Sequence, residues 1–411
     1  KNLIQQILEG EHSDVVVSLK QHGVATAQVV QSYLRSPHKS RRKGLTKKKS
    51  NRSMPSSPSK LASKVAPKTT HFRAEEFFLD TTPVVDHLSH NVCSRQVITA
   101  STAAWEAFEA DPTSAVAHIT SAVEAVADLV RAQPSDVALC ANGVGESLDA
   151  ALRSIQLAPG DAILRLDLVS PHILDAVASA CRAVGADEVV VDARLPMDAE
   201  ALCEAVKDAL VRNQTTLSTS RNVPIASWTP TRIRLAVFDH ISDPHCIELP
   251  VKLLARVCHA FCVPVFVNGS HAVGQTAVDV PDTEADLYAA DLRWCWAPSD
   301  MGFCVVRGEF TSLNHAVTAH LSAAHPRRRA VTASCLVTAI QDLRSKGGPD
   351  TALSGARSVV AAAGKQLTYR WGTNVLAAAS GAAVCVRLPL NVTVAEGEGE
   401  GESEWGLVAE M

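Results

Sequence analysis

The chain has 411 residues and a formal net charge of −4; 46% of its residues are hydrophobic and only 4% are aromatic. This length allows about two to three domains, with a large core that small side chains must fill. No apolar run reaches the ~18 residues of a membrane-spanning helix, and eleven cysteines without paired spacing favour reduced thiols in an intracellular compartment over a disulfide framework.

Residues 1–35 are predicted to form a helical extension, because apolar residues recur there at helical spacing. A basic arm follows at 36–71. Twelve lysines and arginines fall between residues 35 and 68, and no acidic residue interrupts them, so the remainder of the chain carries a net charge of −16. The arm has too few apolar residues to offset the entropy of ordering and is predicted to be disordered.

Strand-like runs alternate with helical ones from residue 72 to 320. This alternation predicts a large α/β domain whose mainly parallel sheet is covered by helices on both faces. The predicted strands are 137–141, 162–166, 188–192, 233–238, 264–267 and 302–306. The predicted helices are 145–156, 172–184, 199–211 and 250–261. Polar residues at 212–230 predict a surface insertion.

The pattern changes near residue 320. Two helices, at 333–343 and 356–368, and a strand at 382–388 are predicted. They make 321–392 a smaller domain that looks truncated. An acidic low-complexity tail of alternating Glu and Gly occupies 393–411.

The most informative motif is Val263–Gln275, with Asn-Gly-Ser-His-Ala at its centre, followed by Ala285–Pro298. Together with Leu-Ala-Pro-Gly-Asp-Ala-Ile-Leu at 157–164 and the turn at His87–Ser94, it resembles the class V aminotransferases, which include cysteine desulfurases and isopenicillin N epimerase-like proteins. The resemblance covers residues 72–390. It implies a PLP-transferase-like large domain with a diverged small domain, and dimers whose sites lie at the subunit interface.

Two cofactor-anchoring positions of that family are changed in this chain. In the family, an Asp pairs with the pyridine nitrogen of pyridoxal phosphate (PLP), and a Lys about two dozen residues later forms the Schiff base. The resemblance places Asn268 at the first position and Arg293, or Trp294, at the second; His271 belongs to the same motif. Asn stabilises a protonated pyridine less well than a carboxylate does, and Arg stays protonated and cannot form a Schiff base.

The turn that holds the cofactor phosphate in the family is also changed. Free N–H groups and the helix dipole favour an anion at a helix N-terminus, and hydroxyl groups complete the family's site. This chain has Gly143, Val144 and Gly145 in the turn, and Glu146 brings a negative charge to it. The family's ring-stacking residue is missing after the next strand, where His172 is the nearest candidate. These changes predict that no cofactor is bound.

A second interpretation of the same turn is a dinucleotide-binding site. Gly143 and Gly145 follow a strand and open a helix, and Asp167 lies 22 residues beyond Gly145, as an acid for a ribose hydroxyl would. Leu148 replaces the third glycine of that fingerprint, and a tight turn between strand and helix explains the two glycines equally well.

A third interpretation keeps an active PLP enzyme whose lysine comes from elsewhere in the chain. No lysine occurs between Lys252 and Lys346, so these two are the candidates. No metal site is predicted: Cys258 and Cys262 flank a histidine at helical spacing, but buried cysteine packing explains that pattern.

The basic arm predicts contact with nucleic acid, preferably RNA. Basic side chains on a flexible segment displace counterions from phosphates without reading sequence, and the absence of aromatic residues in the arm argues against base stacking. A solvated linker, a nuclear import signal and an organelle transit region remain open alternatives. The expected contact residues are Arg41, Arg42, Lys43, Lys47, Lys48, Lys49 and Arg52.

The altered site and the basic arm together lead to an expectation about function. The chain is expected to be a catalytically inactive pseudoenzyme that acts as a structural or assembly subunit of a ribonucleoprotein, such as a mitochondrial ribosome or its assembly intermediate. The resemblance implies a homodimer or a heterodimer with a related chain. The alternative is a PLP-dependent class V aminotransferase or desulfurase-like enzyme, or an inactive regulatory partner of one.

Overall fold

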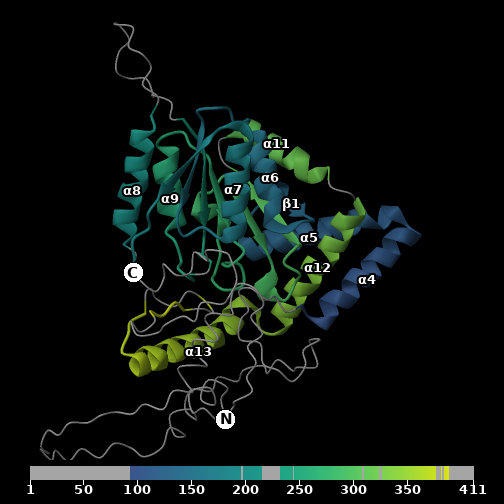
Figure 1. The fold of residues 1–411 in the computed structure, drawn as a ribbon. Coiled ribbons are helices and arrows are strands. Elements are labelled where there is room, and N and C mark those ends of the chain that lie inside the picture. Colours follow the sequence, from purple (N-terminus) through teal and green to yellow (C-terminus); the bar gives the residue numbers. More distant parts are fainter. Residues whose placement is uncertain are drawn as a thin grey trace, which may run out of the picture.

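The computed structural model describes residues 93–195, 198–214, 232–243, 245–307, 310–323, 326–375, 381 and 384–387. The predicted N-terminal helices, basic arm and acidic tail lie outside these residues. At the centre is a seven-stranded sheet in the order β1-β7-β6-β5-β4-β2-β3 (Figure 1). Its strands are β1 (Val137–Cys140), β2 (Ala162–Leu166), β3 (Asp187–Val191), β4 (Ile233–Asp239), β5 (Val265–Asn268), β6 (Leu287–Asp291) and β7 (Gly302–Val306).

Six of the seven strands run in the same direction. β3, β2, β4, β5 and β6 pair in parallel, whereas β7 is antiparallel to both β6 and β1. The carboxyl ends of β1, β2, β4, β5 and β6 therefore meet at one edge of the sheet. This edge is where open α/β sheets bind ligands.

Helices cover both faces of the sheet and create two apolar cores. Figure 1 shows α4 and α12 side by side at one end of the sheet and α8 at the other. One face is covered by α4 (Arg95–Ala110), α5 (Ala115–Val130), α8 (Ala199–Arg212), α9 (Val251–His259) and α12 (Pro326–Ser345). The other is covered by α6 (Gly143–Ser154), α7 (Pro171–Val184) and α11 (Thr311–Ser322). The remaining elements are η2 (Pro112–Ser114), η3 (Pro134–Asp136), α10 (Val280–Thr283), η4 (Arg293–Cys295) and α13 (Gly348–Trp371).

The strands are apolar on both faces because helices cover both faces. Phe238 and Val267 belong to one core, while their chain neighbours Val237 and Phe266 belong to the other. All four side chains are fully buried. Continuous apolar runs, rather than alternating ones, are typical of parallel strands buried in this way.

Local sequence determines where several helices begin and end. α7 begins at Pro171, whose fixed φ suits the first helical position. It ends at Gly185, which has a left-handed φ of 72° that glycine adopts without strain. α8 begins after Asp198, whose carboxylate accepts hydrogen bonds from the N–H groups of Glu200 and Ala201.

The α/β architecture predicted from the sequence is confirmed, and the six strands predicted for the large domain are present. The strand β6 and the helices α4, α5 and α11 were not predicted from the apolar runs in the sequence. Two of the five residues of β6 are alanine, and α4 buries only Val97 and Ala104, so its apolar stripe is narrow. The predicted helix at 333–343 lies in the C-terminal part of the longer α12. At the predicted strand 382–388, an isolated bridge between Val375 and Val386 is present among the described residues.

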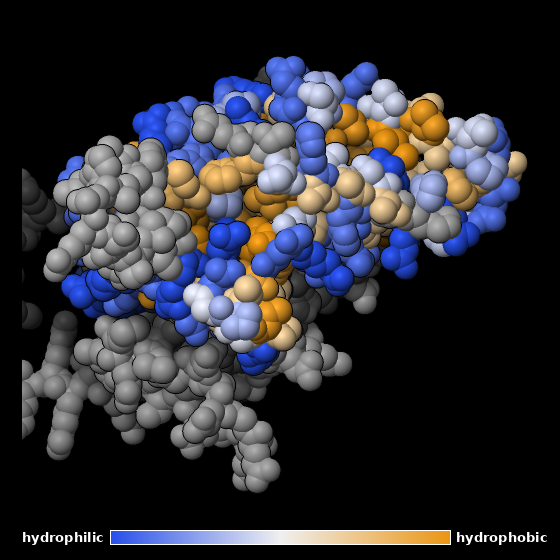
Figure 2. Space-filling view, turned by 90° about the horizontal axis from the view of Figure 1, so that it is seen from above, coloured by the Kyte–Doolittle hydropathy of each residue, from blue (hydrophilic) through white to orange (hydrophobic). Residues whose placement is uncertain are grey.

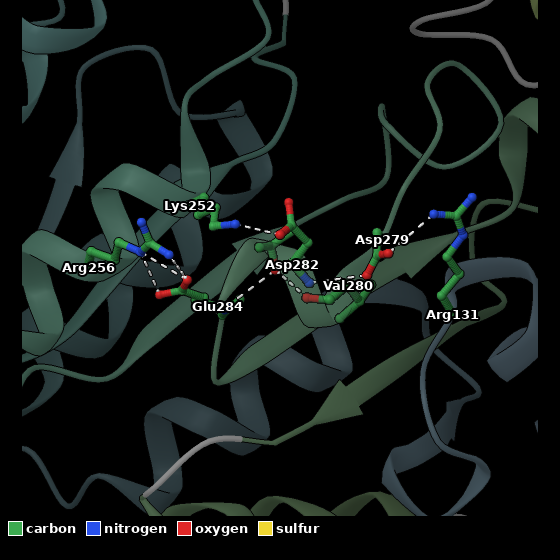
Figure 3. A network of polar contacts seen from close by, with 9 residues as sticks. Arg131, Lys252, Arg256, Asp279, Val280, Asp282 and Glu284 are labelled. Atoms are coloured by element: carbon green, nitrogen blue, oxygen red, sulfur yellow. Dashed lines mark hydrogen bonds and ion pairs between the residues drawn. The ribbon is translucent and has the colours of Figure 1, made fainter.

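The described surface is mixed in character. Apolar residues lie among hydrophilic ones (Figure 2), and the exposed large apolar side chains include Trp105 on α4 and Val116 on α5. Figure 3 shows a chain of surface ion pairs that joins α9 to the α10 region, including Arg256 with Glu284 at 2.9 Å. No helix in the described part of the chain is long and apolar enough to cross a membrane.

Candidate functional site

Five loops converge at the carboxyl edge of the sheet. α6 follows β1 and α7 follows β2, while the segments after β4, β5 and β6 bring in residues 240–249, 269–276 and 292–297. We refer to Asp243, His172, His271, Arg293 and Asp291 as the edge cluster. Asp291 ends β6, and the other four members come from the segments that follow β2, β4, β5 and β6.

Asn268 lies at the end of β5, as predicted, and is fully engaged by neighbouring strands. It pairs in register with Asp239 at the end of β4, and its amide nitrogen donates to Asp239 Oδ1 at 2.8 Å. Its amide oxygen accepts from the N–H of Ser270 at 3.1 Å. Both ends of the amide are therefore used within the protein.

Asp239 is a buried carboxylate that the sequence analysis did not identify. Besides Asn268, it accepts a hydrogen bond from the Ser170 N–H at 2.7 Å and a short one from the Ser170 hydroxyl. Burial raises the pKa of Asp239 to about 6, although the hydrogen bonds from Ser170 and Asn268 oppose the rise. The sequence signal that could have found it is a polar residue closing the apolar run of β4.

Arg293 begins η4, and its guanidinium is anchored by Asp291. Nε lies 2.9 Å from Asp291 Oδ1 and Nη2 lies 2.7 Å from Oδ2, while the Arg293 N–H also donates to Oδ1 at 3.0 Å. The arginine side chain is 17% exposed and that of Asp291 only 1%. Although burial opposes it, this bidentate pair raises the pKa of Arg293 above its usual value.

Beside the Arg293–Asp291 pair, the edge cluster contains Asp243, His271 and His172. The His271 ring is fully buried, and its Nε2 lies 3.6 Å from Asp243 Oδ2. Burial opposes ionisation of Asp243, but His271, His172 and Arg293 together hold the pKa of that carboxyl below its usual value. The pKa of His172 is lowered, mainly by burial and further by Arg293. A carboxylate thus faces three nitrogen-bearing groups.

Several buried polar atoms at this edge lack hydrogen-bond partners. Among the described residues, neither ring nitrogen of His271, nor Nδ1 of His245, nor the hydroxyl of Ser270 has one. Buried polar groups in folded proteins are nearly always paired with protein or with water. The carboxyl edge of the sheet thus contains buried polar atoms without a hydrogen-bond partner beside a charged cluster, although His271 Nε2 still faces the Asp243 carboxylate.

The N-terminus of α6 already carries a negative charge from the chain itself. Gly143 is needed at the turn because its φ is 63° and a Cβ there would lie 2.7 Å from the Ser299 carbonyl oxygen. Val144 is buried, and Gly145 is open to solvent. The Glu146 carboxylate accepts a hydrogen bond from the Asn142 N–H at 3.0 Å. The Asn142 N–H, which could otherwise donate to a bound anion, therefore donates to Glu146.

The comparisons with known proteins find partial sequence similarity to one group of enzymes. No protein-family model matches the chain. An L-cysteine desulfhydrase of Arabidopsis thaliana is 30% identical over 156 residues, which cover 35% of this chain and 34% of that protein. The putative L-cysteine desulfhydrase 1 of Oryza sativa subsp. japonica is 28% identical over 229 residues, 52% of this chain and 45% of that protein. The chain thus spans less than half the length of the curated relatives it matches.

Solved structures share the fold at low sequence identity. A lysine-to-alanine mutant of C-DES with glycine covalently linked to the PLP cofactor superposes with a TM-score of 0.60 and 15% identity, covering 77% of this chain and 86% of that one. The cysteine desulfurase CsdA of Escherichia coli gives 0.54 and 17%, covering 73% and 77%. Part of the chain is similar in sequence to L-cysteine desulfhydrases, and the chain has the fold of these PLP-dependent enzymes. The family resemblance inferred from the motifs is confirmed.

The expectation of an inactive scaffold in a ribonucleoprotein is wrong. The relatives are named as L-cysteine desulfhydrases, and the structures of the same fold are a cystine C–S lyase and cysteine desulfurases. That expectation was based largely on the basic arm. Positive charge on a flexible arm favours contact with phosphate groups, but it does not identify which partner carries them. The residues expected to contact RNA, Arg41 to Arg52, lie outside the described residues.

The residues of this chain do not fit covalently bound PLP at the positions that the motif assigns to the family's cofactor-binding residues. Arg293 offers no amine that can lose its proton and is closed onto Asp291. The amide nitrogen of Asn268 donates to Asp239 and its amide oxygen accepts from Ser270, so both are already hydrogen-bonded within the protein. Glu146 holds a negative charge at the helix end where the phosphate would lie. The loss of enzymatic activity inferred from these residues remains a prediction.

The other site predictions have the following outcomes. Lys252 is paired with Asp282 in the surface network of Figure 3, and Lys346 lies 2.7 Å from Asp342, so both amines are held in ion pairs. Asp167 directly follows β2, near the predicted strand end, but its carboxylate accepts the Ala193 N–H at 2.9 Å. The described residues contain no group of three side chains placed to hold a metal ion.

Proposed function

We propose that the chain takes part in desulfhydrase-type, PLP-dependent cleavage of L-cysteine or a close analogue. The observation that carries this proposal is its sequence similarity to four proteins named as L-cysteine desulfhydrases or putative ones. The carboxyl edge of the sheet, with its charged and unpaired polar groups, is the proposed site. One of these relatives is named chloroplastic; a mitochondrial location stays a proposal, to be tested with a fluorescent fusion of the full-length protein.

The chain is proposed to act as the partner of a lysine-bearing relative. When bound, PLP supplies an electron sink for cleaving a carbon–sulfur bond, and the amine that holds it comes from the other subunit. In this chain, the Arg293–Asp291 pair fixes the first turn after β6, and the Asp239–Asn268–Ser170 bonds fix the ends of β4, β5 and β2. The chain's own residues thus keep the edge rigid and charged.

A second candidate is that the chain itself is the PLP-dependent enzyme. The observation that favours it is the C-DES structure above, in which a protein of this fold with a lysine replaced by alanine holds PLP linked to glycine. In that case the chain binds the cofactor without a bond to the protein. The two candidates differ in whether the purified chain releases sulfide alone.

The deciding experiment measures sulfide release from L-cysteine in the presence of PLP. It compares the chain alone, a lysine-bearing relative from the same genome, and the two coexpressed. Copurification with an altered kcat/KM of the relative, and no sulfide from the chain alone, is the expected result. Sulfide release by the chain alone, abolished by Arg293→Met and Asp243→Asn, would assign catalysis to the chain itself. No sulfide and no copurification would contradict both candidates.

A further inference from the structure

Helix α4 has apolar side chains that face solvent. It lies at one end of the sheet with α12 beside it (Figure 1), and only Val97 and Ala104 of its sixteen residues are buried. Ile98 and Trp105, which are 37% and 46% exposed, are seven residues apart and therefore share one face of the helix; we call them the α4 stripe. A single exposed apolar residue is ordinary, but a tryptophan in line with an isoleucine on so thinly buried a helix indicates a face that another segment covers.

The N-terminus of α12 places positive charge beside the α4 stripe. The Arg327 guanidinium lies 4.3 Å from the centroid of the Trp105 ring and pairs with Glu109 at 2.5 Å. The next residue, Arg328, is exposed and forms no ion pair among the described residues. The buried Nε of Arg329 has no hydrogen-bond partner within the same part of the chain. A segment with both large apolar and acidic side chains would match this surface.

The chain contains such a segment shortly before α4. Residues 72–79 read Phe-Arg-Ala-Glu-Glu-Phe-Phe-Leu, so three of the nine phenylalanines of the chain and two adjacent glutamates fall within eight residues. Tyr33 is the only other Phe, Tyr or Trp before residue 93. Removing large apolar side chains from water is favourable, so these rings are expected to find a partner on the body of the protein.

The connection to α4 is long enough for this segment to reach the α4 stripe. Thirteen residues separate Leu79 from Cys93, and an extended chain of that length spans up to about 45 Å. Trp105 lies eleven residues after Ser94, the N-cap of α4, which is about 17 Å along a helix. Because the segment is tethered close to its target, its effective concentration there is high.

We propose that residues 72–79 dock on the α4 stripe. The phenylalanine rings lie on the two apolar side chains of the stripe, and the two glutamates face the arginines at the start of α12. This contact covers the exposed face of α4. It also makes the α4–α12 end of the sheet the place at which the basic arm, residues 36–71, joins the body of the protein.

Photo-crosslinking of the full chain tests this docking. The photoreactive residue p-benzoylphenylalanine is introduced at position 105, and crosslinks in a mixture of isotope-labelled and unlabelled chains are mapped by mass spectrometry. Position 211 is the matched control, because Val211 is 50% exposed on α8 at the opposite end of the sheet (Figure 1). Crosslinks to residues 72–79 of the same chain are expected at least about tenfold more often from position 105 than from position 211.

The other outcomes of this experiment would overturn the proposal. Crosslinks between labelled and unlabelled chains would show that a second copy covers the α4 stripe. Crosslinks within one chain to residues 1–35 would assign the stripe to a different segment. Equal crosslinking from positions 105 and 211 would show that residues 72–79 have no preferred place on the body.

Charge reversal tests the polar half of the contact. Arg328→Glu is expected to reduce the crosslink from position 105 to residues 72–79 by about tenfold, because like charges then face each other. Adding Glu75→Arg and Glu76→Arg to that variant is expected to restore it. Arg212→Glu, which reverses an exposed charge at the end of α8, is the control and should leave the crosslink unchanged. An unchanged crosslink in Arg328→Glu, or no recovery in the combined variant, would refute the charge pairing.

Hydrogen exchange gives a second readout that needs no photoreactive residue. Trp105→Ser should raise the exchange rates of the amides of residues 72–79 by at least about tenfold, whereas the amides of β4 and β5 should keep their native rates. Val211→Ser is the matched control and should change neither set. Native rates at residues 72–79 in Trp105→Ser would contradict the docking, and thermal unfolding of each variant shows whether the body remains folded.

Discussion

Two adjacent buried residues are expected to give opposite contributions to stability over the same range of pH. Asp239 ends β4 and His240 directly follows it; their exposed fractions are 1% and 8%. Burial raises the pKa of Asp239 from 3.8 to about 6 and lowers the pKa of His240 from 6.5 to about 4. Each residue is less easily charged in the folded protein than in the unfolded chain.

The sign of each contribution follows from which state binds more protons. Between pH 3.8 and about 6, folded Asp239 keeps a proton that the unfolded chain releases, so its contribution to stability falls as pH rises. Between about pH 4 and 6.5, unfolded His240 binds a proton that the folded protein excludes, so its contribution rises with pH. Each tenfold change in proton affinity is worth about 1.4 kcal/mol, which makes each contribution about 3 kcal/mol. The two contributions nearly cancel in the native chain.

Urea unfolding between about pH 4 and about pH 7 tests this compensation. The quantity to follow is the free energy of unfolding of the variant minus that of the native chain. For His240→Gln, this difference should fall by about 3 kcal/mol from about pH 4 to about pH 7. In Asp239→Asn, the same difference should change by a similar amount in the opposite direction, whatever the cost of its lost hydrogen bonds. Differences that stay flat within about 1 kcal/mol in both variants would refute the reasoning.

Two further expectations concern packing and pairing. Gly269→Ala should lower stability by about 1 to 3 kcal/mol, because the new Cβ would lie 2.3 Å from the buried Tyr288 ring; Gly145→Ala, with nothing within 4 Å of its new Cβ, is the control and should be neutral or slightly stabilising. Arg165→Met should cost about 1 to 3 kcal/mol, because it leaves Glu188 without its partner at 2.7 Å on neighbouring strands that limit its hydration. Thermal or urea unfolding measures both stability changes. If Arg165→Met lowers stability no more than removal of an exposed ion pair of Figure 3 does, the expectation for Arg165 is contradicted.

The parts of the fold that could be predicted from the sequence are those with strong local patterns. Continuous apolar runs identified six strands, and Gly and Pro marked the ends of α7. Helix α4 could not be found in this way, because its one buried stripe consists of Val97 and Ala104. β6 was missed because two of its five residues are alanine and its burial depends on partners far along the chain.

The edge cluster could be predicted only in part. Asn268, His271 and Arg293 belong to a motif, and the structure brings His271 and Arg293 near the same carboxylate, that of Asp243. The meeting of Asp243 with His172 and His271 could not be foreseen, since these residues lie on separate loops whose convergence is decided by strand order. The anchoring of Arg293 by Asp291, two positions earlier, depends on the turn at η4 and is not visible in residue spacing.

The link between Arg293 and Asp291 has a consequence for any attempt to build a covalent site here. A lysine at position 293 would lie beside the carboxylate of Asp291, which is almost fully buried. This carboxylate would favour the charged ammonium form of the lysine, which cannot act as a nucleophile. Gaining a nucleophilic amine therefore takes two coordinated replacements rather than one, with the acid at 291 exchanged together with the base.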